Sequence, residues 1–524
     1  MTTSQSQTDD SMAARKAAYG ALSNMVVRLF SFGCTQVAFR LMKDDVAALG
    51  KASIQLELLL STTLFVSREG FRLSLTRNLE VDNWNVAWLC IPVSTLAATM
   101  ALLWHLSNAL TDEDFRLGGV LYCFAAWIEG IAEPAVLQSL RQMNVSLRVS
   151  AEGTATLCKT LVTVVALKRW LPEWPIWAFG VAQLSYALVY AVFLYTKMWP
   201  HLTFPVKGGF DGRTCYMTLL FTVQGLFKHL LTEGDRIVLS TLSDGYNQGI
   251  YAMGSAYGGL AARFLLQPLE ENARLLWSRL HSARKDNSRR IKQSYLVLIK
   301  LVLYIGFTFS CLATNYTSIL LNIMAGSKWG SNKEAVAVLS AFCIYTAFLA
   351  WNGMTEAFIF GVATSGGEIG RMGLMHTVVG LTFAVFAPVC VDKFGTIGLV
   401  AANCVAMVMR SLYSVHFAAA YFDKERTEKG KALSVVSKMS GLMKKMCPHW
   451  MVMLSFGTSA AATNASLALL DTRDNVKGTI TWYFLAMRHI GIGVVCYAGT
   501  LAIAYRTETE FRSSMRALLR SKED

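Results

Sequence analysis

The sequence predicts an all-α polytopic membrane protein, and two observations carry this prediction. Of the 524 residues, 53% are hydrophobic and only 16% are charged, and the mean hydropathy is +0.38. An ordinary soluble protein carries about 25% charged residues. Apolar runs of about 20 residues recur along the chain, which is the length that an α-helix needs to cross about 30 Å of hydrocarbon. No alternating pattern of about ten residues occurs, so an outer-membrane barrel is not expected.

The ends of the apolar runs define 14 expected helical spans. The expected spans cover residues 17–39, 54–67, 84–106, 116–138, 148–167, 174–195, 215–231, 248–270, 295–313, 336–360, 372–391, 397–420, 450–470 and 482–504. We group them into an N-lobe of six spans (17–195), an inter-lobe linker (196–214), a C-lobe of six spans (215–421), an amphipathic connector (422–449) and two extra spans (450–504), with polar tails at 1–16 and 505–524.

A weak internal repeat supports the two lobes. The first span of the N-lobe leads through a loop to Leu49-Gly50 and a second helix, and the first span of the C-lobe leads similarly to Gln248-Gly249 and a second helix. Repeated lobes with a substrate cavity between them are a common transporter plan. The sequence therefore favours a transporter architecture.

The distribution of Lys and Arg predicts the orientation of the chain. An even number of spans puts both termini on one side, and the loops on that side, including 274–292 and 424–446, contain most of the cations outside the spans. The positive-inside rule then places both termini in the cytosol. We interpret the net charge of +14 as a cytosolic belt and not as a nucleic-acid site. In this topology the sequon at Asn315 falls in a lumenal loop.

Cysteine spacing and the N-terminal residues indicate neither a cofactor nor a cleaved signal. The 11 cysteines are scattered singly without a CxxC pair, so no zinc site and no disulfide framework is expected. The polar N-terminal tail has no cleavage site after the first apolar run, so the first span is expected to act as its own insertion signal.

Residues 227–277 place charged side chains inside a segment that is otherwise apolar. Glu233, Asp235 and Arg236 form a charged turn at the predicted lumenal end of the seventh span, and Arg263 lies in the eighth span, about one turn from its cytosolic end. Each ionisable residue in hydrocarbon costs about 2.5–3.5 kcal/mol even on insertion scales, so it tends to face a cavity, a ligand or a partner. We predict a gate or structural ion pair at the charged turn.

Five separate motifs in the same order resemble the eukaryotic Rft family of endoplasmic-reticulum membrane proteins, within the multidrug/oligosaccharidyl-lipid/polysaccharide exporter superfamily. The motifs are SREGFR (67–72), HLLTEGDR (229–236), Gln248-Gly249 with Tyr251, ARFLLQPLEE (262–271) and NGMTEAF (352–358). The resemblance covers about 19–505. It implies 14 helices in two lobes, an endoplasmic-reticulum location and a role in N-glycosylation, at the step where a dolichol diphosphate-linked heptasaccharide reaches the lumen.

A dolichol diphosphate-linked oligosaccharide as partner would require cations for its phosphates. Arginine suits a diphosphate because its planar fork binds pairs of oxygens and stays charged. The resemblance to the superfamily implies that spans 1, 2, 7 and 8 line the cavity, so the candidate ligands are Arg28, Arg68, Arg72 and Arg263. The alternatives are structural ion pairs with Glu57, Glu69 or Glu270 for Arg28 and Arg263, and cytosolic interface positions for Arg68 and Arg72.

Acidic residues in the spans predict a second, structural set of contacts. Glu129 and Glu133 are four residues apart, and Glu152 and Lys159 are seven apart, so each pair shares one helix face. We expect an ion-pair network between spans 4 and 5, with a proton or cation site as the alternative. Glu356 in NGMTEAF is expected to make one buried polar contact beside Gly353, where glycine permits close helix approach.

The expected function is translocation of the lipid-linked oligosaccharide, and it has three alternatives. Catalysis is not expected, because no phosphate-binding glycine loop, HExxH or GxSxG occurs and the first lumenal loop offers only Asp44-Asp45. A drug or cation antiporter would need a cavity lined by carboxylates such as Glu57, Glu129 and Glu133. A non-transporting factor that binds the lipid-linked glycan is the remaining alternative.

Overall fold

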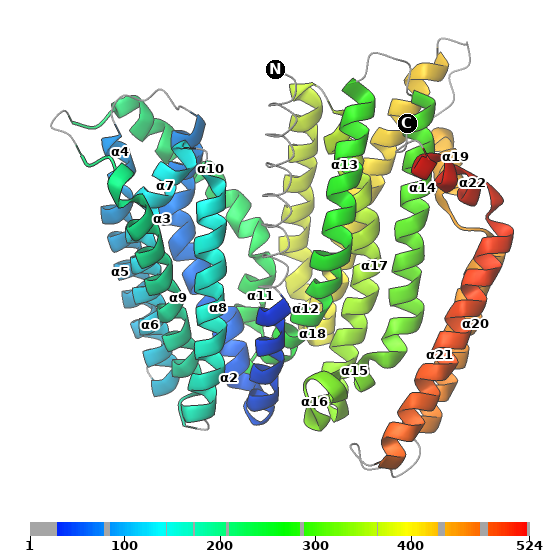
Figure 1. Ribbon diagram of the computed structural model, residues 1–524, viewed down its shortest axis with the longest axis horizontal. Helices are drawn as coiled ribbons and strands as arrows, with labels where there is room; N and C mark the ends of the chain where they lie inside the picture. The colour runs from blue at the N-terminus through cyan, green and yellow to red at the C-terminus, as the bar shows by residue number, and fades with distance from the viewer. Residues whose placement is uncertain are drawn as a thin grey trace, which may run out of the picture. The chain divides into compact units, whose positions relative to one another are not determined.

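The chain folds into α-helices, as the sequence predicts. The computed structural model describes residues 29–77, 84–109, 111–142, 144–170, 173–205, 209–282, 288–363, 365–427, 435–471 and 480–520 (Figure 1). Across these ranges the regular elements are all helical, which confirms the all-α fold class. Each predicted span from the second onward coincides with a helix.

Nine helical segments in the described ranges are long and apolar enough to cross a membrane. They are Val46–Thr76, Asn85–Asn108, Glu113–Arg141, Pro175–His201, Ser288–Met324, Lys333–Val362, Gly366–Asp423, Trp450–Leu470 and Ile480–Thr507. The helices at predicted spans 5, 7 and 8 carry more polar residues and are not among the nine. The count of 14 crossings therefore stays a prediction.

The chain divides into two compact units, Met1–Gly249 and Ile250–Asp524. Besides the helical residues 29–41, the helices that begin in the first unit are η1 (Met42–Asp44), α2 (Val46–Gly50), η2 (Lys51–Leu56), α3 (Glu57–Arg77), α4 (Asn85–Trp88), α5 (Cys90–Asn108), α6 (Glu113–Ile131), α7 (Glu133–Arg141), α8 (Val145–Trp170), α9 (Pro175–Met198), η3 (Trp199–His201), α10 (Gly212–Thr232), α11 (Gly234–Leu242) and α12 (Gly245–Ala261). The division falls inside α12, and α10 and α11 belong to the first unit, where α10 packs along α3. The functional lobe boundary at 196–214 stays a prediction.

Aspartate side chains fix the starts of several helices in the first unit. Asp112 caps α6 by accepting a hydrogen bond from the backbone N–H of Phe115, and Asp211 caps α10 in the same way. Asp114 accepts two 2.8 Å hydrogen bonds from the N–H groups of Ile176 and Trp177 at the start of α9. Such contacts satisfy backbone donors that a helix cannot pair internally, and the last one fastens α9 beside α6.

The two glycine segments of the internal repeat meet in the first unit. A Cβ added to Gly50 would lie 2.0 Å from the backbone oxygen of Gly245, and one added to Gly249 would lie 2.0 Å from that of Val46. Backbone therefore packs directly on backbone, which explains why both positions carry glycine. Gln248 is fully buried between them and donates hydrogen bonds to the carbonyl oxygens of Leu239 and Ser243.

The second unit holds the remaining helices. These are η4 (Ala262–Leu266), α13 (Gln267–Ser282), α14 (Ser288–Phe307), η5 (Thr308–Leu312), η6 (Ala313–Tyr316), α15 (Thr317–Met324), α16 (Ser327–Ser331), α17 (Lys333–Val362), α18 (Gly366–Thr427), α19 (Val435–Met446), α20 (Trp450–Asp471), α21 (Ile480–Thr507) and α22 (Thr509–Arg520). Gly395 has a φ of 58° inside α18. This left-handed conformation, which favours glycine, breaks α18 where the sequence predicts the turn between spans 11 and 12.

The core of the second unit joins α13, α14, α17 and α18 through buried aromatic rings. Trp277, Tyr295 and Phe358 lie within 6.0 Å of one another by ring centroid. Leu442 and Met446 of α19 belong to the same buried cluster. Helix α19, within the predicted amphipathic connector, therefore packs on the helices of this unit, while its place relative to the membrane stays a prediction.

The prediction that Asn315 lies in a loop is wrong, and its lumenal side stays a prediction. Asn315 lies in η6, is only 8% exposed, and donates a 2.8 Å hydrogen bond to Thr463 of α20. The helical chain continues through η5 and η6 into α15 instead of ending near residue 313, because α20 and α21 supply polar partners for this segment.

Candidate functional site

Helix α3 carries three of the predicted site residues along one face. Glu57, Arg68 and Arg72 are separated by 11 and 4 residues, which corresponds to about three turns and one turn of an α-helix. They lie in or at the end of a candidate membrane span, where an unpaired charge would be costly. Each of the three side chains has a partner of opposite charge on another helix of the first unit. We call these three ion pairs the α3 charge seam.

The tightest pair of the α3 charge seam joins Arg72 to Glu133 of α7. The guanidinium donates from Nε to one carboxylate oxygen and from Nη2 to the other, the latter over 2.7 Å. The two side chains are 15% and 1% exposed. A bidentate pair of this kind is the strongest geometry that an arginine and a carboxylate can adopt. It leaves little of the Arg72 fork for another anion.

The second pair is looser and includes a residue that the sequence analysis missed. Arg68 Nη1 lies 3.7 Å from Oε2 of Glu129 in α6. The other carboxylate oxygen accepts a 3.0 Å hydrogen bond from Nε2 of Gln183 in α9, which is 2% exposed. Gln183 could have been noticed because it is a lone amide inside an apolar span, where a polar side chain needs a partner.

The third pair differs from the network expected between spans 4 and 5. Lys159 of α8 lies 3.0 Å from Glu57 of α3, whereas Glu152 pairs with Arg148 one turn away on its own helix. The charges of spans 4 and 5 therefore meet those of span 2. The reason is geometric. Helix α3 presents charges of both signs to α6, α7 and α8, and the charged residue on each of these helices pairs with the α3 residue of opposite sign.

The α3 charge seam is electrically balanced, with three carboxylates against three cations. Removing charges from water costs several kcal/mol per ion, and only close, hydrogen-bonded partners repay that cost. An incoming diphosphate would have to replace Glu129 at Arg68, or Glu133 at Arg72. The three carboxylates that a cation antiporter would need each face a basic residue. The seam can thus lock helices together or exchange partners with a charged ligand.

The remaining predicted cations are placed differently. Arg263 lies on the π-helical turn η4 of the second unit with an exposed side chain, and no ion pair joins it to another described residue. Arg28 lies outside the described residues. Whether any of the four arginines binds a diphosphate stays a prediction.

The other predicted acidic residues make local contacts. Arg236 at the start of α11 pairs with Glu233 over 3.0 Å, and Asp235 lies in the same turn. In the second unit, Glu356 lies 3.0 Å from Nε2 of His376. A Cβ at Gly353 would lie 1.9 Å from the Glu270 carboxylate. The absence of a side chain at Gly353 therefore lets Glu270 pack against this helix. The roles of these residues as gates or locks stay predictions.

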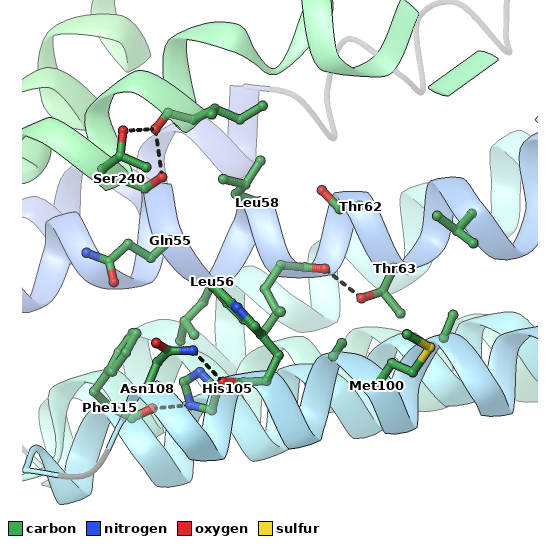
Figure 2. A pocket seen from close by; sticks show the side chains of 17 residues that line it. Gln55, Leu56, Leu58, Thr62, Thr63, Met100, His105, Asn108, Phe115 and Ser240 are labelled. Carbon is green, nitrogen blue, oxygen red and sulfur yellow. Dashed lines mark hydrogen bonds between the residues drawn. The ribbon is translucent and has the colours of Figure 1, made fainter. Parts of the chain in front are cut away.

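A cavity of about 800 Å³ lies inside the first unit (Figure 2). Helices α3, α5 and α11 provide most of its wall, and Phe115 at the start of α6 closes one end. None of the predicted site residues lines it. Sequence reasoning missed it because its lining side chains are ordinary for a membrane span, and only the packing of three helices creates the space.

The described part of the chain holds no group of three His, Cys, Asp or Glu side chains arranged to bind a metal ion.

Comparison with known proteins identifies the family. The family described as "Rft protein" matches residues 12–518. A mouse protein named "Man(5)GlcNAc(2)-PP-dolichol translocation protein RFT1" is 27% identical, with 97% of this chain and 96% of the relative covered. Relatives of the same name from Xenopus tropicalis and Dictyostelium discoideum are 26% and 24% identical, with at least 95% of each chain covered.

A solved structure supports the fold. The inward-facing conformation of a multidrug resistance MATE family transporter of the MOP superfamily has a TM-score of 0.54 and 13% identity, covering 77% of this chain and 99% of that one. This similarity concerns the fold alone. The family follows from the match over almost the whole sequence: the chain is a member of the Rft protein family.

Proposed function

We propose that this protein translocates a dolichol diphosphate-linked oligosaccharide from the cytosolic to the lumenal leaflet of the endoplasmic-reticulum membrane, for use in N-glycosylation. The observation that carries the proposal is the match over at least 95% of the chain to relatives named as Man(5)GlcNAc(2)-PP-dolichol translocation proteins.

The mechanism requires a cation that can receive the diphosphate. Arg263 is the best candidate of the described residues, because its side chain is exposed while Arg68 and Arg72 already contact carboxylates. A π-helical turn such as η4 widens the helix locally and often occurs at functional positions. In this proposal Arg263 receives the diphosphate near the cytosolic face.

The α3 charge seam has a different part in the proposal. Its three pairs keep the helices of the first unit in register while the protein alternates between access to the two leaflets. Arg68 is the member that can change partner, because its 3.7 Å contact with Glu129 is the longest of the three pairs. Both termini remain in the cytosol throughout the cycle.

Translocation is tested by placing the purified full-length protein in liposomes that contain a radiolabelled dolichol diphosphate heptasaccharide. A membrane-impermeant lectin then reports the fraction of glycan exposed outside. We expect the protein to accelerate exchange between leaflets at least tenfold over protein-free vesicles. Arg263→Ala should reduce the rate at least fivefold, whereas Arg279→Ala, an exposed arginine of α13, should leave it unchanged.

Two outcomes would contradict parts of the proposal. Retained binding of the lipid without acceleration of exchange would identify a non-transporting factor. Acceleration that is unaffected by Arg263→Ala would leave translocation standing and remove Arg263 as the diphosphate ligand.

A further inference from the structure

We propose that the cavity between α3, α5 and α11 binds the isoprenoid chain of the lipid substrate. This inference rests on the proposed function, because it assigns a site to the apolar part of a dolichol-linked molecule. The cavity belongs entirely to the first unit, and its lining, its opening and its size all suit a hydrocarbon chain.

The lining of the cavity suits hydrocarbon and not a charged or sugar headgroup. It contains no Lys, Arg, Asp or Glu, so a diphosphate would find no ion partner there. Every polar side chain in the lining is already hydrogen-bonded within the protein: Gln55 to Gln248, Thr62 to His229, Thr63 to Leu59, His105 to Phe115, Asn108 to Trp104, and both Ser240 and Thr241 to Ile237. What remains for a ligand is mainly carbon surface.

The opening of the cavity lies where the bilayer would cover the protein. Met100 and Trp104 line the cavity and are each 63% exposed, and so is the neighbouring Leu103 on α5. Helix α5 belongs to a candidate membrane span, and exposed apolar side chains of such a span face lipid. A chain can therefore enter from the hydrocarbon without passing through water.

The size of the cavity fits part of a long chain. A volume of about 800 Å³ falls in the range of about 300–1,000 Å³ typical of sites for small ligands. Ala97 and Ala101 leave room on the α5 side. The site would hold one segment of the chain while the rest stays in the bilayer, which gives the protein a contact that distinguishes a dolichol-type lipid from its surroundings.

The test uses a photoreactive isoprenoid diphosphate carrying a benzophenone on its chain, added to the full-length protein in nanodiscs of phosphatidylcholine. After illumination, mass spectrometry locates the adducts. We expect them on Met100, Trp104 or their neighbours in the lining, with competition by an excess of unlabelled dolichol diphosphate oligosaccharide. Because labelling is measured without transport, a protein that binds but does not translocate still gives the signal.

Cavity-filling variants make the test specific. Ala101→Phe and the milder Ala97→Leu both place carbon inside the cavity and should reduce labelling at least fivefold, with melting temperatures confirming that each variant folds. Val165→Phe adds an aromatic ring at an exposed position of α8 outside the lining and should label like the wild type. Adducts outside the lining would overturn the site, even if translocation itself is observed. Normal labelling of folded Ala101→Phe and Ala97→Leu would overturn it as well. Equal competition by free phospholipid would overturn the isoprenoid as occupant.

Discussion

Two regions of this protein bury polar side chains among apolar helices, and they do so by opposite means. The α3 charge seam of the first unit uses three ion pairs. In the second unit, η6, α20 and α21 meet through neutral groups: Asn315 bonds Thr463, His489 bonds Ser466 and the Asn315 carbonyl, and Thr500 bonds Ser455 and Ser459. We call this second set the neutral seam.

The two seams differ in the free energy lost when one partner is removed and in whether a charged ligand can replace a partner. Removing one partner of a buried ion pair costs about 3–5 kcal/mol, because the other charge is left without compensation. A neutral hydrogen bond between membrane helices averages about 0.6 kcal/mol and reaches about 1.7. Only the charged seam offers groups that a charged ligand could also engage. Substrate-dependent rearrangement is therefore expected there, and a fixed attachment of α20 and α21 in the neutral seam.

The largest effect is expected from Glu133→Ala in the charged seam. The substitution leaves the Arg72 guanidinium buried without its bidentate partner. We expect a loss of about 3–5 kcal/mol in the free energy of unfolding, measured by denaturant unfolding in detergent micelles and visible as a strong decrease in the amount of folded protein.

The double variant Arg72→Leu/Glu133→Leu separates charge from packing. It removes both members of the pair and keeps apolar bulk between α3 and α7, so it should recover most of the stability lost in Glu133→Ala. If the double variant is as unstable as the single one, the burial of an unpaired charge is not the cause, and the distinction between the two seams fails.

The next effect is expected from Gly493→Ala in the neutral seam. A Cβ at this position would lie 2.0 Å from the hydroxyl oxygen of Tyr316, whose ring stacks on His489 with 4.4 Å between centroids. The ring cannot retreat without breaking that stack, so overpacking should cost about 1–3 kcal/mol. Thermal unfolding measures the loss, and Gly491→Ala on the same helix, which has open space around it, should behave like wild type.

A smaller effect is expected from Asn315→Ala. The side-chain amide of Asn315 donates to Thr463 and to the carbonyl of Ala460, and the loss should lie between about 0.6 and 1.7 kcal/mol. The exposed Asn464→Ala on α20 serves as the control. Because Asn315 is buried, it should carry no glycan, so glycosidase treatment should shift the mass of the wild type and of Asn315→Ala by the same amount. Glycan on Asn315 would contradict the neutral seam itself.

The two seams also show which features of the structure can be predicted from the sequence. Apolar length alone predicts the helices. Gly50 and Gly249, which the sequence singles out, lie where backbone packs on backbone, whereas the internal repeat stays a prediction. The partners of Glu133 and Lys159 were not predictable, because they come from α3, more than 60 residues away in the chain, and helix periodicity gives the face of a residue but not the helix opposite it. The burial of Asn315 was missed for the same reason. A sequon marks an acceptor only where the chain is exposed.

The smallest effect is confined to acidic pH and concerns Glu508, which follows α21. Burial disfavours the charged form of Glu508, but hydrogen bonds from Lys300 and from the N–H of His449 outweigh it and hold its pKa below the ordinary value. A lowered pKa in the folded state means that the carboxylate stabilises the fold above the ordinary glutamate pKa. This stabilisation is lost as the pH falls through the folded pKa.

The measurement is the melting temperature of wild type and Glu508→Gln in detergent between pH 7 and pH 3. The wild type should be more stable at neutral pH, and the two curves should converge in acid, because protonated Glu508 resembles glutamine. Glu510→Gln, an exposed acid two residues further on, should run parallel to the wild type throughout. A constant difference in melting temperature between wild type and Glu508→Gln down to pH 3 would mean that the charge of Glu508 does not contribute to stability. The contact with Lys300 would then stabilise the fold by packing and neutral hydrogen bonding, as the contacts of the neutral seam do.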